Sequence, residues 1–296
     1  MTTIEFNYSK IFIDQEGQLC VHGYEYLTYD DKRFRSIDPQ FTPIQSSPSL
    51  PPLRSIVTHS HNQSNCSITA LTQSNQHINI DVIDGKVSYN VLDEGCLIVD
   101  YDIILTTSGQ AVFSGCDPVP ELSQSKIRWI GSYDGCDGYE VVIVLIDDQF
   151  YRFNNDKLTL IGEVKDIKTI RDCIVIDKLG YAYSFFEIRG AIELDELSSC
   201  VDACRHKGDA YLLDDRGDIR KYREKYHEFA ESSEWESIQY IESGMKMKRL
   251  VGSDIISGYG VIAESEDGDY YQIDGSSLKK IELPKLHSSR INEMII

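Results

Sequence analysis

The sequence predicts an all-β fold, a seven-bladed β-propeller with four-stranded antiparallel blades. Three observations predict it: seven copies of a strand, turn and strand pattern, a mean spacing of about 42 residues between them, and scarce helical periodicity along the 296 residues. Each copy joins an apolar run, a polar or acidic turn, and a second strand rich in Tyr, Phe or Val. The copies are residues 11–23, 67–82, 103–115, 142–153, 173–185, 210–222 and 260–273.

The turns of the seven copies align on one position. That position is occupied by Gly17, Asn75, Gly109, Asp148, Gly180, Gly217 and Gly268. Glycine closes five of the seven turns because a short hairpin loop ends in a residue with positive φ, where a Cβ is costly. Asparagine tolerates this conformation next best. We therefore expect a positive φ at the aligned position.

Further candidate strands flank the hairpins. Residues 167–170 and 191–194 lie before and after the fifth hairpin, and residues 248–252 and 279–283 lie around the last. Four strands per repeat is the number in a propeller blade. Only residues 221–238 have helical periodicity, and that segment fits a strand-and-loop excursion equally well.

Closure of the ring is expected to use a terminal strand. A blade cannot bury both of its faces alone, and stacking in a closed ring leaves only short edges. Residues 3–8 and 291–296 are two candidate strands, one of which would complete a blade begun at the opposite end. The Pro/Ser-rich segment 38–53 is interpreted as a long loop because the repeat continues across it. Residues 1–296 are thus predicted to form a single propeller domain.

The net charge of −19 disfavours nucleic acid as a partner and insertion into a membrane, because phosphate backbones and anionic lipid heads both repel such a surface. Residues 1–148 hold 8 Lys/Arg against 20 Asp/Glu, so this half is suited to steering a basic partner, although solubility explains the charge more simply. The first residues have neither the basic flank nor the apolar stretch of a signal peptide, so we expect none. We expect a cytoplasmic monomer with reduced cysteines, delivered into a host cell if the source is an intracellular bacterium.

Two copies, IILTTSGQAVFSG (103–115) and IFIDQEGQLCVHG (11–23), resemble the repeat of the regulator of chromosome condensation family. Residues 127–132 and 247–254 are similar to the small-residue strand that precedes the hairpin in that family. The family's Gly-x-x-His and Gly-Gln-Leu-Gly motifs are missing, so the chain would be a remote member. The resemblance implies a seven-bladed ring that presents one face to a protein, as a guanine-nucleotide exchange factor or another regulator of a small GTPase, eukaryotic or bacterial effector-like.

Two alternatives remain open at the level of the sequence. One is an inhibitor or scaffold propeller that plugs a partner protein's site, and the other is a hydrolase that uses paired carboxylates. Such pairs, for example Asp214 and Asp215, have a local explanation, because aspartate accepts hydrogen bonds from turn amides. We predict no catalytic residues.

No metal site or cofactor is predicted. The candidate ligands are Cys200, Cys204 and His206 in one segment and His59 and His61 in another. On a strand, residues four apart share a face but lie roughly 13 Å apart, beyond the reach of one ion.

The predicted partner-binding residues lie in hairpin turns, in the excursion 131–140 and in a charged segment near residue 235. If every repeat is a blade, the turns emerge on one face and form an acidic rim that also includes Asp14 and Glu16, whereas residues 131–140 lie on the opposite face. Trp129 is expected in the core and Trp235 at the surface as an anchor. The predicted set is Tyr133, Asp134, Asp137, Tyr139, Asp147, Asp148, Asp177, Asp214, Asp215, Trp235, Glu266 and Asp267.

Overall fold

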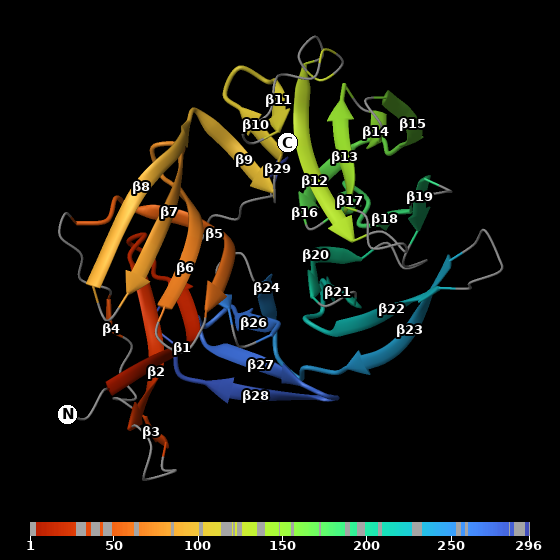
Figure 1. Ribbon diagram of the computed structural model, residues 1–296. Helices are drawn as coiled ribbons and strands as arrows, with labels where there is room; N and C mark the ends of the chain where they lie inside the picture. Colours follow the sequence, from red (N-terminus) through yellow and green to blue (C-terminus); the bar gives the residue numbers. More distant parts are fainter. Residues whose placement is uncertain are drawn as a thin grey trace. The chain divides into compact units, whose positions relative to one another are not determined.

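The structure is a computed structural model, and nearly all of the residues that it describes form β-strands (Figure 1). Within this described part, helical geometry occurs only at residues 120 and 122. The described residues are 4–27, 34–36, 42–43, 49–61, 65–83, 86–100, 103–113, 120, 122, 126–134, 140–147, 149–154, 157–171, 173–186, 190–193, 199–206, 209–226, 233–252, 256–257, 260–283, 285–286 and 294–295.

The chain divides into two compact units. The first consists of residues 1–99, 253–260 and 282–291, and the second of residues 100–252, 261–281 and 292–296. The prediction of a single closed ring stays a prediction.

The first unit holds two antiparallel sheets. The first has the order β25-β1-β2-β3, with β4 also pairing β2: β25 (Ile256–Ser257), β1 (Ile4–Ile13), β2 (Leu19–Leu27), β3 (Phe34–Ser36) and β4 (Thr42–Pro43). The second runs in chain order: β5 (Leu53–His61), β6 (Asn65–Thr72), β7 (Gln76–Ile83) and β8 (Lys86–Glu94). They share a core in which Ile13 and Leu19 meet Leu53, Ile68 and Ile78. The strand β9 (Cys96–Asp100) follows.

The second unit begins with a hairpin of β10 (Ile103–Thr106) and β11 (Ala111–Phe113). Two antiparallel sheets come next along the chain. One contains β12 (Ile127–Asp134), β13 (Glu140–Ile146), β14 (Gln149–Asn154) and β15 (Lys157–Glu163). The other has the order β19-β18-β17-β16-β29: β16 (Ile167–Arg171), β17 (Ile174–Asp177), β18 (Ala182–Phe186), β19 (Gly190–Glu193) and β29 (Met294–Ile295).

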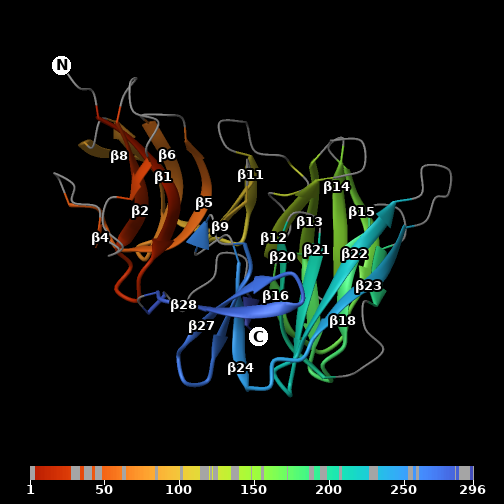
Figure 2. The same cartoon turned by 90° about the horizontal axis from the view of Figure 1, so that it is seen from below.

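Two further four-stranded sheets complete the second unit (Figure 2). One contains β20 (Cys200–His206), β21 (Asp209–Asp214), β22 (Ile219–Tyr226) and β23 (Ser233–Ile241). The other contains β24 (Met247–Val251), β26 (Ile262–Ser265), β27 (Tyr270–Asp274) and β28 (Ser277–Ile281). Leu213 of the one and Leu250 of the other belong to a single buried cluster, so these sheets pack face to face.

All seven predicted hairpins are present, as β1–β2, β6–β7, β10–β11, β13–β14, β17–β18, β21–β22 and β26–β27. The expected positive φ is confirmed at six of the aligned positions: Gly17 (82°), Asn75 (63°), Gly109 (81°), Gly180 (89°), Gly217 (94°) and Gly268 (84°). In the fourth hairpin Asp148 lies outside the described residues, and Asp147 has a φ of 52°. That turn is tighter because Ile146 pairs with Gln149.

The helical alternative for residues 221–238 is wrong, because the segment contributes to strands β22 and β23. In the backbone register of the two strands, Lys225 lies opposite Glu234 and Arg223 opposite Glu236. The alternating charges along this segment therefore belong to a hairpin rather than to a helix.

The ends of the chain pair in a way that the sequence did not specify. β29 lies against β16, with Thr169 opposite Ile295, so it extends a sheet built from the middle of the chain. The first sheet instead gains β25, where Ile256 pairs with Phe12, and Asp14 forms an isolated bridge with Leu286. Segments late in the chain thus complete the N-terminal sheet, but the terminal strand does not.

The first strands of five sheets, called leading strands below, share one irregularity. The pairing of β5, β12, β16, β20 and β24 with the next strand shifts register directly after their first residue. A β-bulge places one extra residue in the strand and reverses the face to which the following side chains point.

Candidate functional site

The hairpin turns have a common internal geometry. The side chain of the first turn residue accepts a hydrogen bond from the amide four residues later, as Asp14 does from Gln18 (2.8 Å) and Asp177 from Tyr181 (2.9 Å). Asp214 receives bonds from Arg216 (3.0 Å) and Asp218 (2.9 Å) through one oxygen. These three acids therefore build the turns, as their position in the sequence suggested.

Three turns of the second unit form a continuous row, called the turn row below: residues 177–180, 214–217 and 265–268. Each is tied to the residue that precedes the leading strand of its own sheet. The amide of Lys178 donates to the Asp166 carbonyl (2.8 Å), that of Asp215 to Ser199 (3.0 Å), and that of Glu266 to Lys246 (3.1 Å).

Neighbouring turns in this row are also joined to the next sheet. The carbonyl of Gly180 accepts from the amide of Cys200 (2.9 Å). Cys200 directly follows Ser199, whose carbonyl holds the turn 214–217. The α-carbon of Gly217 lies against the backbone of Met245 and Met247. These two residues flank Lys246, whose carbonyl holds the turn 265–268. The three turns are therefore side by side.

The outer surface of the turn row mixes apolar and charged groups. Leu179 is 70% exposed at a turn tip, and Met245 is 39% exposed in the segment that follows β23. The exposed charged side chains are Lys178, Asp215, Arg216, Lys246, Glu266 and Asp267. Lys246 bonds Glu266 at 2.9 Å, and this bond raises the pKa of Lys246. The acids of this row thus alternate with bases, which weakens the expectation of a uniformly acidic rim.

The other predicted binding residues are placed unevenly. Asp147 is exposed, whereas Asp177 and Asp214 are buried in their turns. Tyr133 and Asp134 end β12, where they pair with Val141 and Glu140, and Trp235 pairs with Glu224. Asp137, Tyr139 and Asp148 lie outside the described residues. Trp129 is fully buried, as expected.

The cysteine and histidine candidates do not form a metal centre within the described residues, where no group of three His, Cys, Asp or Glu side chains could hold an ion. Cys200 and Cys204 do not share a face, contrary to expectation. Cys200 packs with Ile174 and Leu212, whereas Cys204 packs with Leu213 and Leu250. The bulge in β20 lies between the two cysteines and explains the reversal.

One arrangement of cysteine, histidine and aspartate occurs in the first unit. The Nδ1 atom of the buried His77 lies 3.3 Å from Asp93, and Cys96 is close by. Burial, with the charge of Asp93, raises the pKa of Cys96 to about 11. A nucleophilic cysteine needs the opposite shift. This trio therefore does not constitute an activated thiol.

Thiol labelling tests this conclusion. Burial also raises the pKa of Cys20 to about 12, with Asp14 adding to the shift. At pH 8 we expect iodoacetamide to modify Cys20 and Cys96 about 100-fold more slowly in the folded protein than in urea, because the thiolate fraction falls with rising pKa. Mass spectrometry of the labelled peptides gives both rates. Equal rates in the two conditions would contradict the assignment.

A buried charged network links the leading strands of three sheets, and sequence reasoning missed it. Arg171 of β16, 2% exposed, donates from Nη1 to Asp202 of β20 (3.4 Å) and to the carbonyl of Leu250 in β24 (2.5 Å). The amide of Leu250 donates in turn to Asp202 (2.5 Å). The available signal was an arginine and an aspartate within the strands IKTIR and CVDACRH. Within the described residues this network pairs one arginine with one aspartate, as a structural ion pair does.

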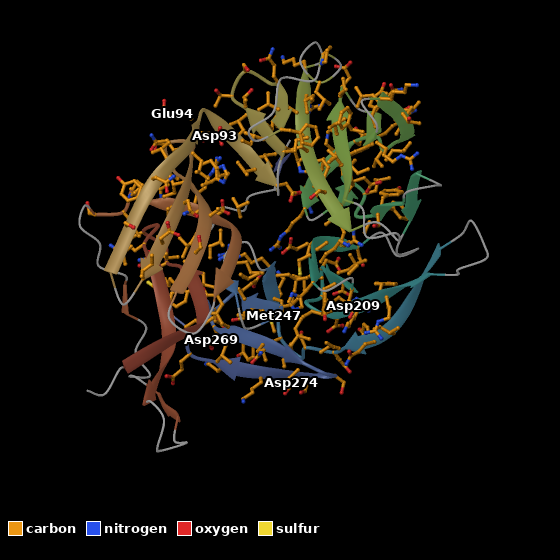
Figure 3. The ribbon with its side chains drawn as sticks, in the orientation of Figure 1. Asp93, Glu94, Asp209, Met247, Asp269 and Asp274 are labelled. Carbon is orange, nitrogen blue, oxygen red and sulfur yellow. The ribbon has the colours of Figure 1, made fainter. Side chains whose placement is uncertain are left out.

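A second carboxylate is bound by two cations on the face of the β20–β23 sheet (Figure 3). Asp209 accepts from Arg223 (2.9 and 3.1 Å) and lies 2.6 Å from Lys221. Burial alone would raise the pKa of Asp209, but the hydrogen bonds from Arg223 and Lys221 outweigh it and lower that pKa. This acid is ionised and occupied, so it is a poor proton donor for hydrolysis.

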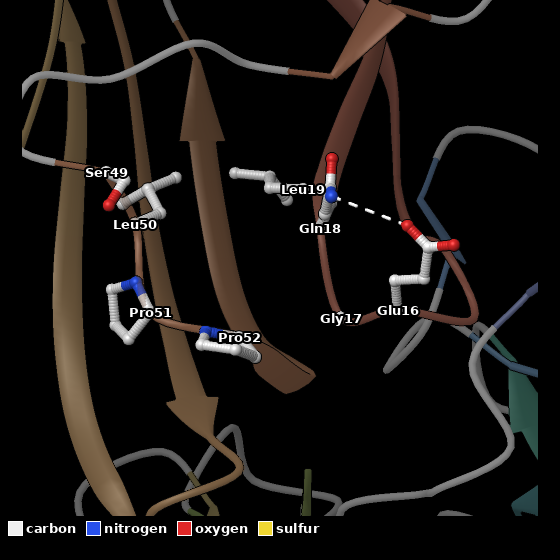
Figure 4. A pocket seen from close by; sticks show the side chains of 8 residues that line it. All are labelled: Glu16, Gly17, Gln18, Leu19, Ser49, Leu50, Pro51 and Pro52. Atoms are coloured by element: carbon white, nitrogen blue, oxygen red, sulfur yellow. Dashed lines mark hydrogen bonds between the residues drawn. The ribbon is translucent and has the colours of Figure 1, made fainter.

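The first unit has a pocket of about 280 Å³ beside the turn that joins β1 to β2 (Figure 4). Its wall on one side is the turn, and on the other the segment that leads into β5. The lining residues are Glu16, Gly17, Gln18, Leu19, Ser49, Leu50, Pro51 and Pro52.

No protein-family profile matches the chain, and no curated protein sequence matches it. Similar solved structures include a candidate 6-phosphogluconolactonase from Bacteroides uniformis (11% identity, 99% of each chain, TM-score 0.47). Others are the BP39L lectin from Burkholderia pseudomallei (11%, 95% of this chain and 96% of that one, 0.48) and Hsv2 of Kluyveromyces lactis (11%, 95% and 98%, 0.41). Likeness at this level carries no inference about ligand or activity. No helix among the described residues is long and apolar enough to cross a membrane.

Proposed function

We propose that the chain is a seven-bladed β-propeller that binds a protein through the turn row. The ring is supported by a hydrogen bond that recurs between successive sheets, in which the amide of the first residue of β5, β9, β12 or β20 donates to a turn carbonyl of the preceding sheet. A hydrogen bond that repeats between neighbouring sheets rotates each sheet in the same direction relative to the one before it, as the blades of a closed ring require. The bonds are Leu53 to Gly17 (2.7 Å), Cys96 to Asn75 (2.8 Å), Ile127 to Gly109 (2.9 Å) and Cys200 to Gly180 (2.9 Å).

The proposed binding role rests on Leu179, an exposed apolar side chain on a turn that backbone hydrogen bonds hold in place. A large apolar side chain, 70% exposed at the tip of a turn, has no role in the core. Its turn is held at both ends by backbone hydrogen bonds, so little conformational entropy is lost when a partner covers it. Charged neighbours such as Arg216 and Asp215 supply the polar rim that protein interfaces have.

The partner class that we propose is a small GTPase, and the activity is guanine-nucleotide exchange. Both rest on the resemblance of residues 11–23 and 103–115 to the regulator of chromosome condensation repeat. Exchange needs no catalytic side chain from the chain itself, only a surface that distorts the nucleotide site. An inhibitor or scaffold that covers a partner's site would use the same surface without promoting release.

Release of a fluorescent GDP analogue from a panel of purified small GTPases tests the proposal. We expect at least a tenfold acceleration for one member, abolished by Leu179→Glu, because the introduced carboxylate cannot be desolvated in an apolar contact. Leu160→Glu is the matched control: Leu160 is 54% exposed but lies on the edge strand β15, outside the turn row.

Each result has one meaning. If no GTPase responds, exchange is excluded, and stoichiometric binding without release favours the inhibitor or scaffold. If Leu179→Glu and Leu160→Glu reduce the response equally, the turn row is not the binding surface.

A further inference from the structure

We infer that the pocket beside the first turn binds a lysine or arginine side chain of the partner protein. This inference rests on the proposed protein-binding function and adds the chemistry of the partner. The pocket volume of about 280 Å³ is at the lower end for ligand sites, which suits one long side chain rather than a large ligand.

The pocket has walls for the methylene stem of such a side chain. Leu19 is 2% exposed and belongs to the core of the first unit, and Leu50 packs against the same core. Pro51 and Pro52 form the rest of this apolar side (Figure 4). Lysine and arginine bury their stems on apolar surface while the charged head stays near water.

The backbone around the pocket is fixed before any ligand binds. The Gly17 carbonyl accepts from the amide of Leu53 at 2.7 Å, and the Pro52 carbonyl accepts from the amide of Gln73 at 2.8 Å. The turn itself is closed by Asp14, which binds the amide of Glu16 at 2.9 Å. A preformed site of this kind costs little ordering on binding.

The carboxylate of Glu16 is available to the charged head. Within the described residues no cation lies in ion-pairing distance of Glu16, whereas Glu266 of the turn row pairs with Lys246 at 2.9 Å. The side chain of Gln18 donates to Glu16 only at 3.5 Å, much longer than a charge-assisted bond of about 2.8 Å. A cation entering the pocket would therefore gain a stronger bond than the one it displaces.

Charge complementarity selects a basic partner over the other occupants of an apolar pocket. The chain carries a net charge of −19, and its first 148 residues hold 20 acidic against 8 basic residues. This field attracts a basic segment and repels an acidic one at long range.

A peptide titration tests the inference without any GTPase. The probe is acetyl-Gly-Lys-Gly-amide, added to ¹⁵N-labelled protein while the amide signals of Glu16, Gln18 and Leu19 are followed. We expect saturable shifts at these amides, about fivefold weaker binding for the norleucine analogue, and none for the glutamate analogue. Glu16→Gln should weaken lysine binding about fivefold, the upper range for an exposed ion pair.

Glu94→Gln is the matched control. Glu94 is exposed and accepts from Gln76 at 3.5 Å, as Glu16 does from Gln18, but it lines no part of the pocket. Its replacement should leave lysine-peptide binding unchanged. Equal affinities for the lysine and norleucine peptides, or equal losses in Glu16→Gln and Glu94→Gln, would overturn the inference.

The two proposals fail separately. Leu179-dependent nucleotide release without lysine-peptide binding would exclude the pocket and leave the proposed function intact. Saturable, Glu16-dependent peptide binding without any GTPase response would retain the pocket and exclude exchange.

Discussion

Replacing Asp202 with alanine is expected to lower the free energy of unfolding by about 3–5 kcal/mol, and the melting temperature by roughly 10 °C. The substitution removes the carboxylate of Asp202 from the guanidinium of Arg171, which is 2% exposed, and removes the acceptor of the Leu250 amide. A buried charge that loses its counter-ion keeps its full desolvation cost. Urea unfolding monitored by circular dichroism gives the difference.

The double variant Arg171→Met/Asp202→Ala separates charge burial from packing. Removing both charges should recover a large part of the loss, because no unpaired ion remains. Lys280→Met provides the comparison at the surface, where Lys280 and Asp269 are 2.5 Å apart but 57% and 44% exposed, and should cost less than about 1 kcal/mol. A double variant as unstable as Asp202→Ala would show that the pair does not determine the effect.

Alanine at Gly217 is expected to destabilise the protein by about 3 kcal/mol, far more than alanine at Gly268. Both glycines have positive φ, 94° and 84°, which costs an alanine about 1 kcal/mol. At Gly217 the added Cβ would also lie 2.5 Å from the carbonyl oxygen of Met245 and 2.7 Å from the nitrogen of Met247. Nothing lies within 4 Å of the corresponding position at Gly268.

Chemical denaturation of the two variants in parallel measures this difference directly. Since the backbone strain is common to both, the excess at Gly217 reports the close contact between its turn and the segment that leads into β24. Equal losses would mean that this contact relaxes without cost, and the turn row would then lack the rigidity that the proposed function requires.

The hairpins could be predicted from the sequence because local chemistry determines them. The positive φ at Gly17 or Gly180 and the turn hydrogen bonds of Asp177 depend on a few neighbouring residues. The segment 221–238 was ambiguous because its local charge pattern suits either a helix or a pair of strands. Only the pairing of β22 with β23, which local chemistry does not determine, distinguishes the two.

Features that depend on contacts between distant residues could not be predicted. The pair of Arg171 and Asp202 joins two strands 31 residues apart, and neither side chain has a motif around it. The opposite directions of Cys200 and Cys204 follow from a bulge that the sequence does not mark. The pocket depends on the approach of residues 49–52 to the first turn, which no pattern within either segment indicates.

Four of the turns are tied to the strand that begins the next sheet, through the carbonyls of Gly17, Asn75, Gly109 and Gly180. A turn held in this way cannot gain or lose a residue without breaking the bond to its neighbour. The intervals between the aligned turn residues are unequal, 58 residues between Gly17 and Asn75 and 37 between Gly180 and Gly217, so the variation in length lies outside the turns. Libraries that graft new recognition loops should therefore leave these four turns at their present length.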